Sequence, residues 1–468
     1  MRPLGTSMIA LRQVPRSLAF HDEAEPIHGE APGKFLMFVF RTHGIKQNRI
    51  SGRRPVVLAW VTAGALLMSG GSGALADPVP VDGLDTARLE RIGDVAREYI
   101  EQGRLPGAVW AVARRGGPPH LGTAGPLAPD TIFRIYSMTK PVTAVAVLML
   151  YEEGRFLLGD PVSRYLPEFA DMQVYTGDGQ RRAAKHAITI KQLLTHTAGL
   201  TYDDDAPGVS KLYAEADIWR VSSLDEFSRR IASLPLAFEP GSRWHYSVSY
   251  DVLGRLVEVL SGEPFDEFLA ERIFRPLDMS DTGFRIAPEK LGRLAPLYHR
   301  SADGMQRVPA GEDGDYRDPN PVSFGGGGLL STVGDYLRFA RMLLKEGELE
   351  GVRLLSRKTV ELMMMDQLPA ELGEPKLNES WLGRTENRNG DLHLGLGYGL
   401  GGYVITDVAE NAVPGSVGTY AWGGGASTYF FVDRKEQLAG VFLTQLTPSD
   451  SYPLRAQFRA LVYQAIVD

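Results

Sequence analysis

The sequence predicts an α/β (α+β) fold, in which an antiparallel sheet is flanked by N- and C-terminal helices and joined to an inserted, mostly helical domain. Two observations lead to this prediction. Patterns typical of strands occur near both ends of the chain, and helical patterns fill most of residues 160–390. The 468 residues are 44% hydrophobic and 23% charged, which is ordinary for a globular protein with a sizeable core.

The first elements follow from hydrophobic periodicity. Leu84–Gln102 is amphipathic with a helical period and predicts a surface helix. Ala108–Arg114 predicts a short apolar strand, and a turn at Gly116–Pro118 leads into a second strand towards Gly122. Ser137–Glu153 is apolar on nearly every side, so we expect a helix that is buried all round.

The C-terminal end returns to strand patterns. Thr428–Asp433 and Leu438–Gln445 predict two strands joined by a charged turn at Arg434–Glu436, and Pro453–Ile466 predicts a closing helix. Strands at both ends with helices between them indicate one split domain. We therefore expect residues 77–468 to form a single domain, with an α/β part at about 84–158 and 392–468 and a helical part at about 159–391.

The N-terminal segment resembles a targeting sequence. Arg53 and Arg54 precede an apolar run, Val56–Met68, which is followed by Ala74-Leu75-Ala76. This pattern predicts an N-terminal extension with a secretory signal peptide over residues 1–76, cleaved after Ala76. The run is shorter than the roughly 20 residues of a membrane span, although an uncleaved anchor is the alternative. We expect a bacterial protein that is exported, periplasmic or secreted, without stable membrane insertion.

Composition excludes several kinds of site. The chain has no cysteine, which excludes disulfides, thiolate nucleophiles, cysteine-bound metals and a lipoprotein anchor. Its formal net charge is −7, and residues 77–468 are more acidic than the segment before them. We therefore expect no nucleic-acid partner. The nine histidines are scattered without ligand spacing, so we expect no metal, and His196 is expected to pack and hydrogen-bond.

The chemistry of the chain is indicated by Ser137-Met138-Thr139-Lys140, its only S-x-x-K sequence. Residues three apart on a helix share a face, so the hydroxyl and the amine can meet. A helix N-terminus offers free backbone N–H groups and a favourable dipole, and burial would lower the pKa of Lys140. The alternative is an ordinary capping serine beside a solvated lysine. The chain has no G-x-S-x-G, which excludes a nucleophile elbow.

Five ordered blocks carry a resemblance from about residue 85 to the C-terminus. They are Phe133–Thr143; Leu193–Leu200; Tyr246-Ser247-Val248 with Asp251–Gly254; Gly325–Leu329 with Ser331-Thr332; and Trp422-Gly423-Gly424. In this order they resemble the serine β-lactamase-like superfamily, which includes class C β-lactamases, D,D-peptidases and, closest in pattern, the family VIII carboxylesterases. The resemblance implies a β-lactamase/transpeptidase-like fold.

The resemblance also implies roles for individual residues. Tyr246 matches the family's general base, which later acts as an acid towards the leaving group, and Lys140 is its partner. Either of the two could be the formal base, because a hydrogen-bonded pair titrates as a unit. The backbone N–H groups of Ser137 and Gly425 would form the oxyanion hole. Without the resemblance, the neighbouring aromatic residues favour the alternative that Tyr246 is a core aromatic residue.

Two positions depart from the β-lactamase pattern. Trp422 and Gly423 stand where that class has a Lys-Thr pair for the substrate carboxylate, and Val248 replaces an asparagine. A site without these polar groups should favour neutral esters over anionic lactams. The substrate pocket is expected to include Trp422, Gly423, Gly424, Val248 and His245.

The sequence thus predicts a serine hydrolase, a carboxylesterase that forms a covalent acyl-enzyme on Ser137. It would act on small-molecule esters or amides, with short acyl chains favoured and β-lactamase activity at most weak. No cofactor is needed for this reaction. The alternatives are a β-lactamase or D,D-peptidase, an acyltransferase with the same site, and a non-catalytic binding protein of the same fold. Retention of Ser137, Lys140 and Tyr246 argues against the last alternative.

Overall fold

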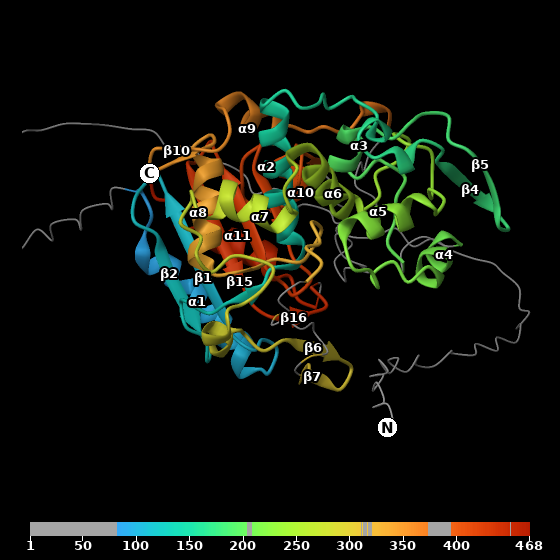
Figure 1. The fold of residues 1–468 in the computed structure, drawn as a ribbon. Coiled ribbons are helices and arrows are strands. Elements are labelled where there is room, and N and C mark those ends of the chain that lie inside the picture. The colour runs from blue at the N-terminus through green and yellow to red at the C-terminus, as the bar shows by residue number, and fades with distance from the viewer. Residues whose placement is uncertain are drawn as a thin grey trace, which may run out of the picture. The chain divides into compact units, whose positions relative to one another are not determined.

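A computed structural model describes residues 82–203, 208–309, 311, 316, 321–372, 395–449 and 451–468. The predicted signal peptide and its cleavage site at Ala76 lie outside these ranges. The central element of the described part is a seven-stranded antiparallel sheet (Figure 1). Its strands are, in spatial order, β11 (Leu396–Tyr398), β12 (Tyr403–Ile405), β13 (Tyr420–Gly423), β14 (Tyr429–Asp433), β15 (Leu438–Leu443), β1 (Ala108–Arg114) and β2 (His120–Ala124).

The two ends of the chain meet within this sheet. β1 pairs with β15, with Val109 opposite Leu443 and Arg114 opposite Leu438. The predicted bounds of β1 are confirmed. Both predicted C-terminal strands are present, but β14 starts one residue later than predicted and β15 ends two residues earlier. The strands β11 and β12 were not predicted, because three residues are too few to show an alternating pattern.

Side chains of β1 alternate between two cores. Val109, Ala111 and Ala113 point into the larger core, whereas Trp110 and Val112 point into a second core on the opposite face. Successive side chains of a strand lie on opposite faces of a sheet, so a strand that is apolar throughout must be covered on both sides.

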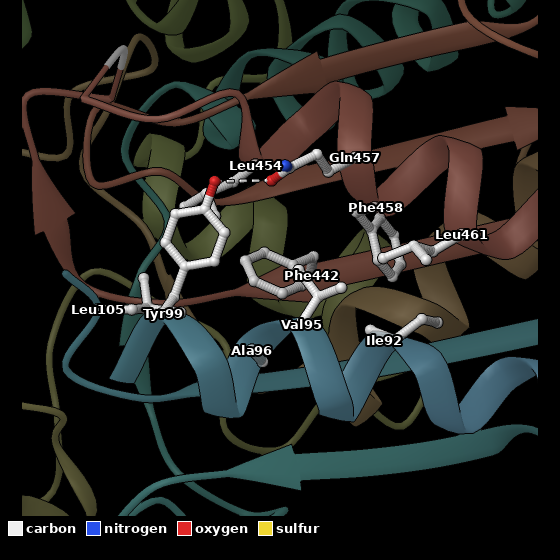
Figure 2. Close-up of a pocket in the computed structure, with 10 residues that line it drawn as sticks. All are labelled: Ile92, Val95, Ala96, Tyr99, Leu105, Phe442, Leu454, Gln457, Phe458 and Leu461. Carbon is white, nitrogen blue, oxygen red and sulfur yellow. Dashed lines mark hydrogen bonds between the residues drawn. The ribbon is translucent and has the colours of Figure 1, made fainter. Parts of the chain in front are cut away.

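Helices α1 (Thr86–Glu101) and α11 (Leu454–Tyr463) pack together and cover the second core. Both predicted terminal helices are present, with ends one to three residues inside the expected bounds. Asp85 begins α1, because its side chain accepts a hydrogen bond from the backbone N–H of Arg88. Figure 2 shows an apolar pocket between α1, α11 and β15, where Tyr99 Oη donates to Gln457 Oε1 over 2.9 Å.

The larger core lies on the other face. It is covered by α8 (Val333–Leu344), which contacts β1, β14 and β15, and by the buried helix α2 (Thr139–Glu152). The other α-helices of the described ranges are α3 (Ile190–Leu194), α4 (Val209–Glu215), α5 (Leu224–Ala232), α6 (Ser249–Ser261), α7 (Phe265–Leu269), α9 (Arg357–Met363) and α10 (Val408–Asn411). Among the residues with described positions, no helix is long and apolar enough to cross a membrane.

The described ranges also contain short strands outside this sheet. Three two-stranded pairs are β3 (Phe133–Arg134) with β8 (Leu330–Ser331), β4 (Gln173–Gly177) with β5 (Gln180–Ala183), and β9 (Glu348–Leu349) with β10 (Val352–Arg353). A three-stranded sheet consists of β16 (Leu446–Thr447), β6 (Tyr298–Ser301) and β7 (Gly304–Arg307), in this order. Helix α8 belongs by sequence to the expected helical part, yet it lies on the sheet (Figure 1). The division at residues 158 and 391 otherwise stays a prediction.

The pairing of β1 with β2 can be tested by a substitution at Gly122. Gly122 lies opposite Trp110, and a Cβ on Gly122 would stand 2.2 Å from the buried indole ring. We expect Gly122→Ala to lower the free energy of unfolding by about 1–3 kcal/mol, because overpacking displaces a well-packed side chain. Thermal unfolding measures this change. Gly159→Ala is the control, since no described atom lies within 4 Å of its Cβ position, and an equal loss in both variants would contradict the register.

Candidate active site

Ser137 lies where the chain turns into α2, a helix that is buried along nearly its whole length. It is the middle residue of a 3₁₀ turn, Tyr136–Met138, that runs directly into α2. The predicted helix is therefore confirmed, except that its first residues form this tighter turn. Tyr136 has a φ of 44°, a left-handed conformation that is uncommon for a residue other than glycine. Ser137 is buried, so its hydroxyl is surrounded mainly by protein groups.

The structure brings the three predicted side chains together. Tyr246 Oη donates a hydrogen bond to Ser137 Oγ over 2.7 Å, and Lys140 Nζ lies 3.3 Å from the same oxygen. The serine and the lysine are one helical turn apart, as their spacing predicts. Tyr246 is 109 residues further along the chain and comes from the segment that leads into α6.

The amine of Lys140 is buried completely. It donates to the backbone carbonyl oxygen of Gly326 over 2.6 Å and to Tyr202 Oη over 3.3 Å. Burial lowers the pKa of Lys140 to about 7, and the negative charge of Asp251 opposes this effect. Near neutral pH a large share of the lysine is therefore uncharged and can accept a proton.

Tyr246 is buried in an aromatic cluster. Its ring lies 4.6 Å from that of His196, 5.4 Å from that of Tyr202 and 5.7 Å from that of Trp422, measured between centroids. Burial raises the pKa of Tyr246 well above its ordinary value, so the side chain is a neutral phenol at physiological pH. Of the two candidate bases, Lys140 is the one that its surroundings favour. His196 packs and hydrogen-bonds to Ser247, as expected.

The glycine block is tied to the nucleophile by backbone contacts. Strands β3 and β8 pair, and the backbone N–H of Ile135 donates to the carbonyl of Leu329. Thr139 and Thr143 of α2 hydrogen-bond to Leu329 and Gly325 from the same side. These contacts place the carbonyl of Gly326 against Lys140.

The end of β13 approaches the same turn. A Cβ on Gly424 would stand 2.2 Å from the carbonyl oxygen of Ile135, and one on Gly425 would stand 3.8 Å from the ring of Tyr136. Only glycine therefore fits at position 424. The space that a side chain would need at Gly423 is occupied by the guanidinium of Arg455. The assignment of the Gly425 N–H to an oxyanion hole stays a prediction.

Other predicted pocket residues have contacts of their own. His245 Nε2 lies 3.0 Å from Thr201 Oγ1, and its ring packs against Phe238. Burial lowers the pKa of His245 to about 4, so the ring is neutral at physiological pH. Val248 is fully buried directly before α6. The part of these two residues in binding substrate stays a prediction.

Sequence reasoning missed three participants. Tyr202 follows the Leu193–Leu200 block, Gly326 lies inside the glycine block, and Asp251 lies in the first turn of α6. A signal existed only for Asp251, an acidic residue that stands directly between the apolar residues Tyr250 and Val252. Within the described ranges, no group of three His, Asp or Glu side chains could hold a metal ion.

Comparison with known proteins identifies the family of the chain. A family model for the beta-lactamase domain matches residues 92–464. The chain belongs to the beta-lactamase family. This membership confirms the predicted family, the predicted fold class and the predicted enzyme class, a serine hydrolase.

Relatives in the beta-lactamase family include esterases and transferases. Esterase EstB of Burkholderia gladioli is 33% identical over 81% of this chain and 96% of its own length. Monacolin J acid methylbutanoyltransferase of Aspergillus terreus is 31% identical over 69% of this chain and 79% of its own. The solved structure of EstCE1, a hydrolase with promiscuous acyltransferase activity, has a TM-score of 0.67, with 27% identity over 81% of this chain and 99% of that one.

The cluster predicts how Ser137 reacts with a fluorophosphonate. We expect the wild-type protein to be labelled on Ser137, and Tyr246→Phe to be labelled about 100-fold more slowly, because one proton-handling group is lost. Mass spectrometry of labelled peptides over time measures this rate. Tyr420→Phe makes the same chemical change at a buried tyrosine that bonds to the Leu400 carbonyl, and should react like the wild type. Equal labelling of all three proteins would contradict the role of Tyr246.

Proposed function

We propose that this protein hydrolyses neutral carboxylic esters through a covalent acyl-enzyme on Ser137. The observation that carries the proposal is the convergence of Tyr246 and Lys140 on a single oxygen, Ser137 Oγ, at 2.7 and 3.3 Å. Such a hydroxyl has both a proton acceptor and a proton donor within reach. This arrangement is typical of an activated nucleophile.

The first half of the reaction forms the acyl-enzyme. Ser137 Oγ attacks the ester carbonyl carbon while its proton moves to the uncharged amine of Lys140. The backbone N–H groups of Ser137 and Gly425 would stabilise the oxyanion, each by about 3 kcal/mol. When the carbon–oxygen bond breaks, Tyr246 gives its phenolic proton to the leaving alcohol and regains one from the Lys140 ammonium, which lies 4.4 Å from the centre of its ring.

The second half releases the acid. Water attacks the acyl carbon, and the Lys140/Tyr246 pair accepts a proton from it. Ser137 Oγ then leaves and regains its own proton, which restores the enzyme. No cofactor takes part in either half.

The surroundings of the site support a neutral substrate. Trp422 is 1% exposed and Gly423 has no side chain, so neither offers a cation to a substrate carboxylate. Val248 likewise offers no amide. Preference for esters is further supported by the relative named as an esterase, EstB, and by EstCE1.

A second candidate function is acyl transfer. The acyl-enzyme is the same, but an alcohol instead of water attacks it. The similarity to monacolin J acid methylbutanoyltransferase and to EstCE1, with its promiscuous acyltransferase activity, favours this candidate. Product analysis with an added alcohol acceptor distinguishes the two, because a transferase yields a new ester and a hydrolase yields the free acid.

We also propose that the enzyme is exported. The proposal is supported by the signal-peptide pattern between Arg53 and Ala76. A mature form that starts at Asp77 would leave the whole described domain intact.

The substrate preference is tested with p-nitrophenyl esters of increasing acyl length beside nitrocefin. We expect turnover of short acyl esters, little or none of nitrocefin, and none above background in Ser137→Ala, because the nucleophile is gone. Initial rates at equal enzyme concentration give kcat/KM for each substrate. If nitrocefin were cleaved faster than every ester, the substrate class would be wrong and the β-lactamase alternative would stand.

The pH dependence follows from the state of Lys140. Its pKa of about 7 means that the amine is protonated below that pH and cannot accept the Ser137 proton. We expect kcat/KM for a short ester to rise with pH through about 7 and then to level off. Rates are corrected with Ser137→Ala at each pH. A flat profile between about pH 5 and 9 would show that no such group controls the step.

A further inference from the structure

Asp251 is a buried carboxylate that the proposed reaction does not use. It lies in the first turn of α6 with 1% of its surface exposed. Its Oδ1 accepts a hydrogen bond from the backbone N–H of Gly326 over 2.8 Å, and its Oδ2 has no hydrogen-bond partner among the described residues. Burying an incompletely paired carboxylate is costly, so such a group needs a compensating cation nearby.

The protonated form of Lys140 is that cation, and Gly326 links the carboxylate to the amine. The carbonyl oxygen of Gly326 accepts from Lys140 Nζ over 2.6 Å, while its N–H donates to Asp251. A Cβ on Gly326 would stand 2.7 Å from Asp251 Oδ2. The loop can therefore connect carboxylate and amine only because this residue is glycine.

We propose that Asp251 is a positioning residue that holds the amine of Lys140 beside Ser137 through Gly326 and sets the pH range in which the enzyme works. This inference rests on the proposed function. It adds that the carboxylate of Asp251 regulates the pH range of the same site, although no hydrogen bond joins it to Ser137 or Tyr246 among the described residues.

The charges around Lys140 support this role. Burial lowers the pKa of Lys140, and the carboxylate of Asp251 raises it again. In return, Lys140 restrains the rise that burial causes in the pKa of Asp251. Burial keeps the other titratable neighbours neutral, since it raises the pKa of Tyr246 and lowers that of His196. Tyr202 also contacts the amine, through its phenolic hydroxyl group.

Loss of the Asp251 carboxylate should shift the pH dependence of activity in a direction that a general loss of stability would not produce. Without the carboxylate, the ammonium form of Lys140 loses its stabilising charge, so the amine releases its proton at lower pH. The acidic limb of the activity profile should then move to lower pH. A residue that only supports packing would lower activity at every pH and leave the midpoint in place.

The experiment compares kcat/KM of Asp251→Asn and the wild type over pH, with a short p-nitrophenyl ester. We expect the midpoint of the acidic limb to fall by about one pH unit or more in Asp251→Asn. This shift is expected at any plateau value of kcat/KM. Asp335→Asn is the matched control, because Asp335 is a buried carboxylate bonded to Asp281 and Thr282. Its midpoint should equal that of the wild type. An unmoved midpoint in Asp251→Asn would overturn the inference.

A second measurement does not depend on folding of Asp251→Asn. Infrared titration of the buried carboxylic acid band, in the wild type and in Lys140→Met, measures how the amine of Lys140 affects protonation of the Asp251 carboxyl group. We expect the band to persist to higher pH in Lys140→Met, because the cation that favours the carboxylate is gone. Titration at the same pH in both proteins would refute the coupling. Failure of the proposed function would look different, since the wild type itself would show no turnover that depends on Ser137.

Discussion

Desolvation of one amine is the constraint on which the site depends. Lys140 has no exposed surface, and water cannot solvate its charge. The interior therefore favours the uncharged amine, which is a proton acceptor, over the ammonium that a solvated lysine would be. The same interior keeps Tyr246 a neutral phenol. In the proposed mechanism, Lys140 as the base and Tyr246 as the acid therefore both reach the hydroxyl of Ser137 at neutral pH.

The fold produces this constraint from distant parts of the chain. Helix α2 is buried because it lies in the larger core, which is bounded by the sheet, α6 and α8. The sheet itself requires both ends of the chain, since β1 pairs with β15. Glycines then allow backbone to approach the site closely. At Gly326 the backbone reaches Lys140 and Asp251, and at Gly424 it reaches the turn before Ser137.

Much of the fold and of the site could be predicted from the sequence. The remaining contacts could not, for physical reasons. Strand β1 is apolar from Ala108 to Ala113, and helix α2 is apolar on nearly every side, so the burial of both elements could be predicted. The meeting of Ser137 and Lys140 follows from helical spacing. Tyr246 had no such signal of its own, because an aromatic residue among aromatic residues is typical of a core, and only the family resemblance singled it out. Tyr202 and Gly326 are brought to Lys140 by loops, and local sequence patterns do not predict loop contacts.

The pKa of Lys140 itself tests the proposed chemistry most directly. NMR titration of the lysine side-chain resonances, with Lys140→Arg to assign the signal and Ser137→Ala to prevent turnover, measures it in the folded protein. We predict a lysine that titrates near pH 7. A Lys140 that titrates at the ordinary value of about 10.4 would contradict this mechanism, since the amine would then be charged at neutral pH and could not accept the serine proton.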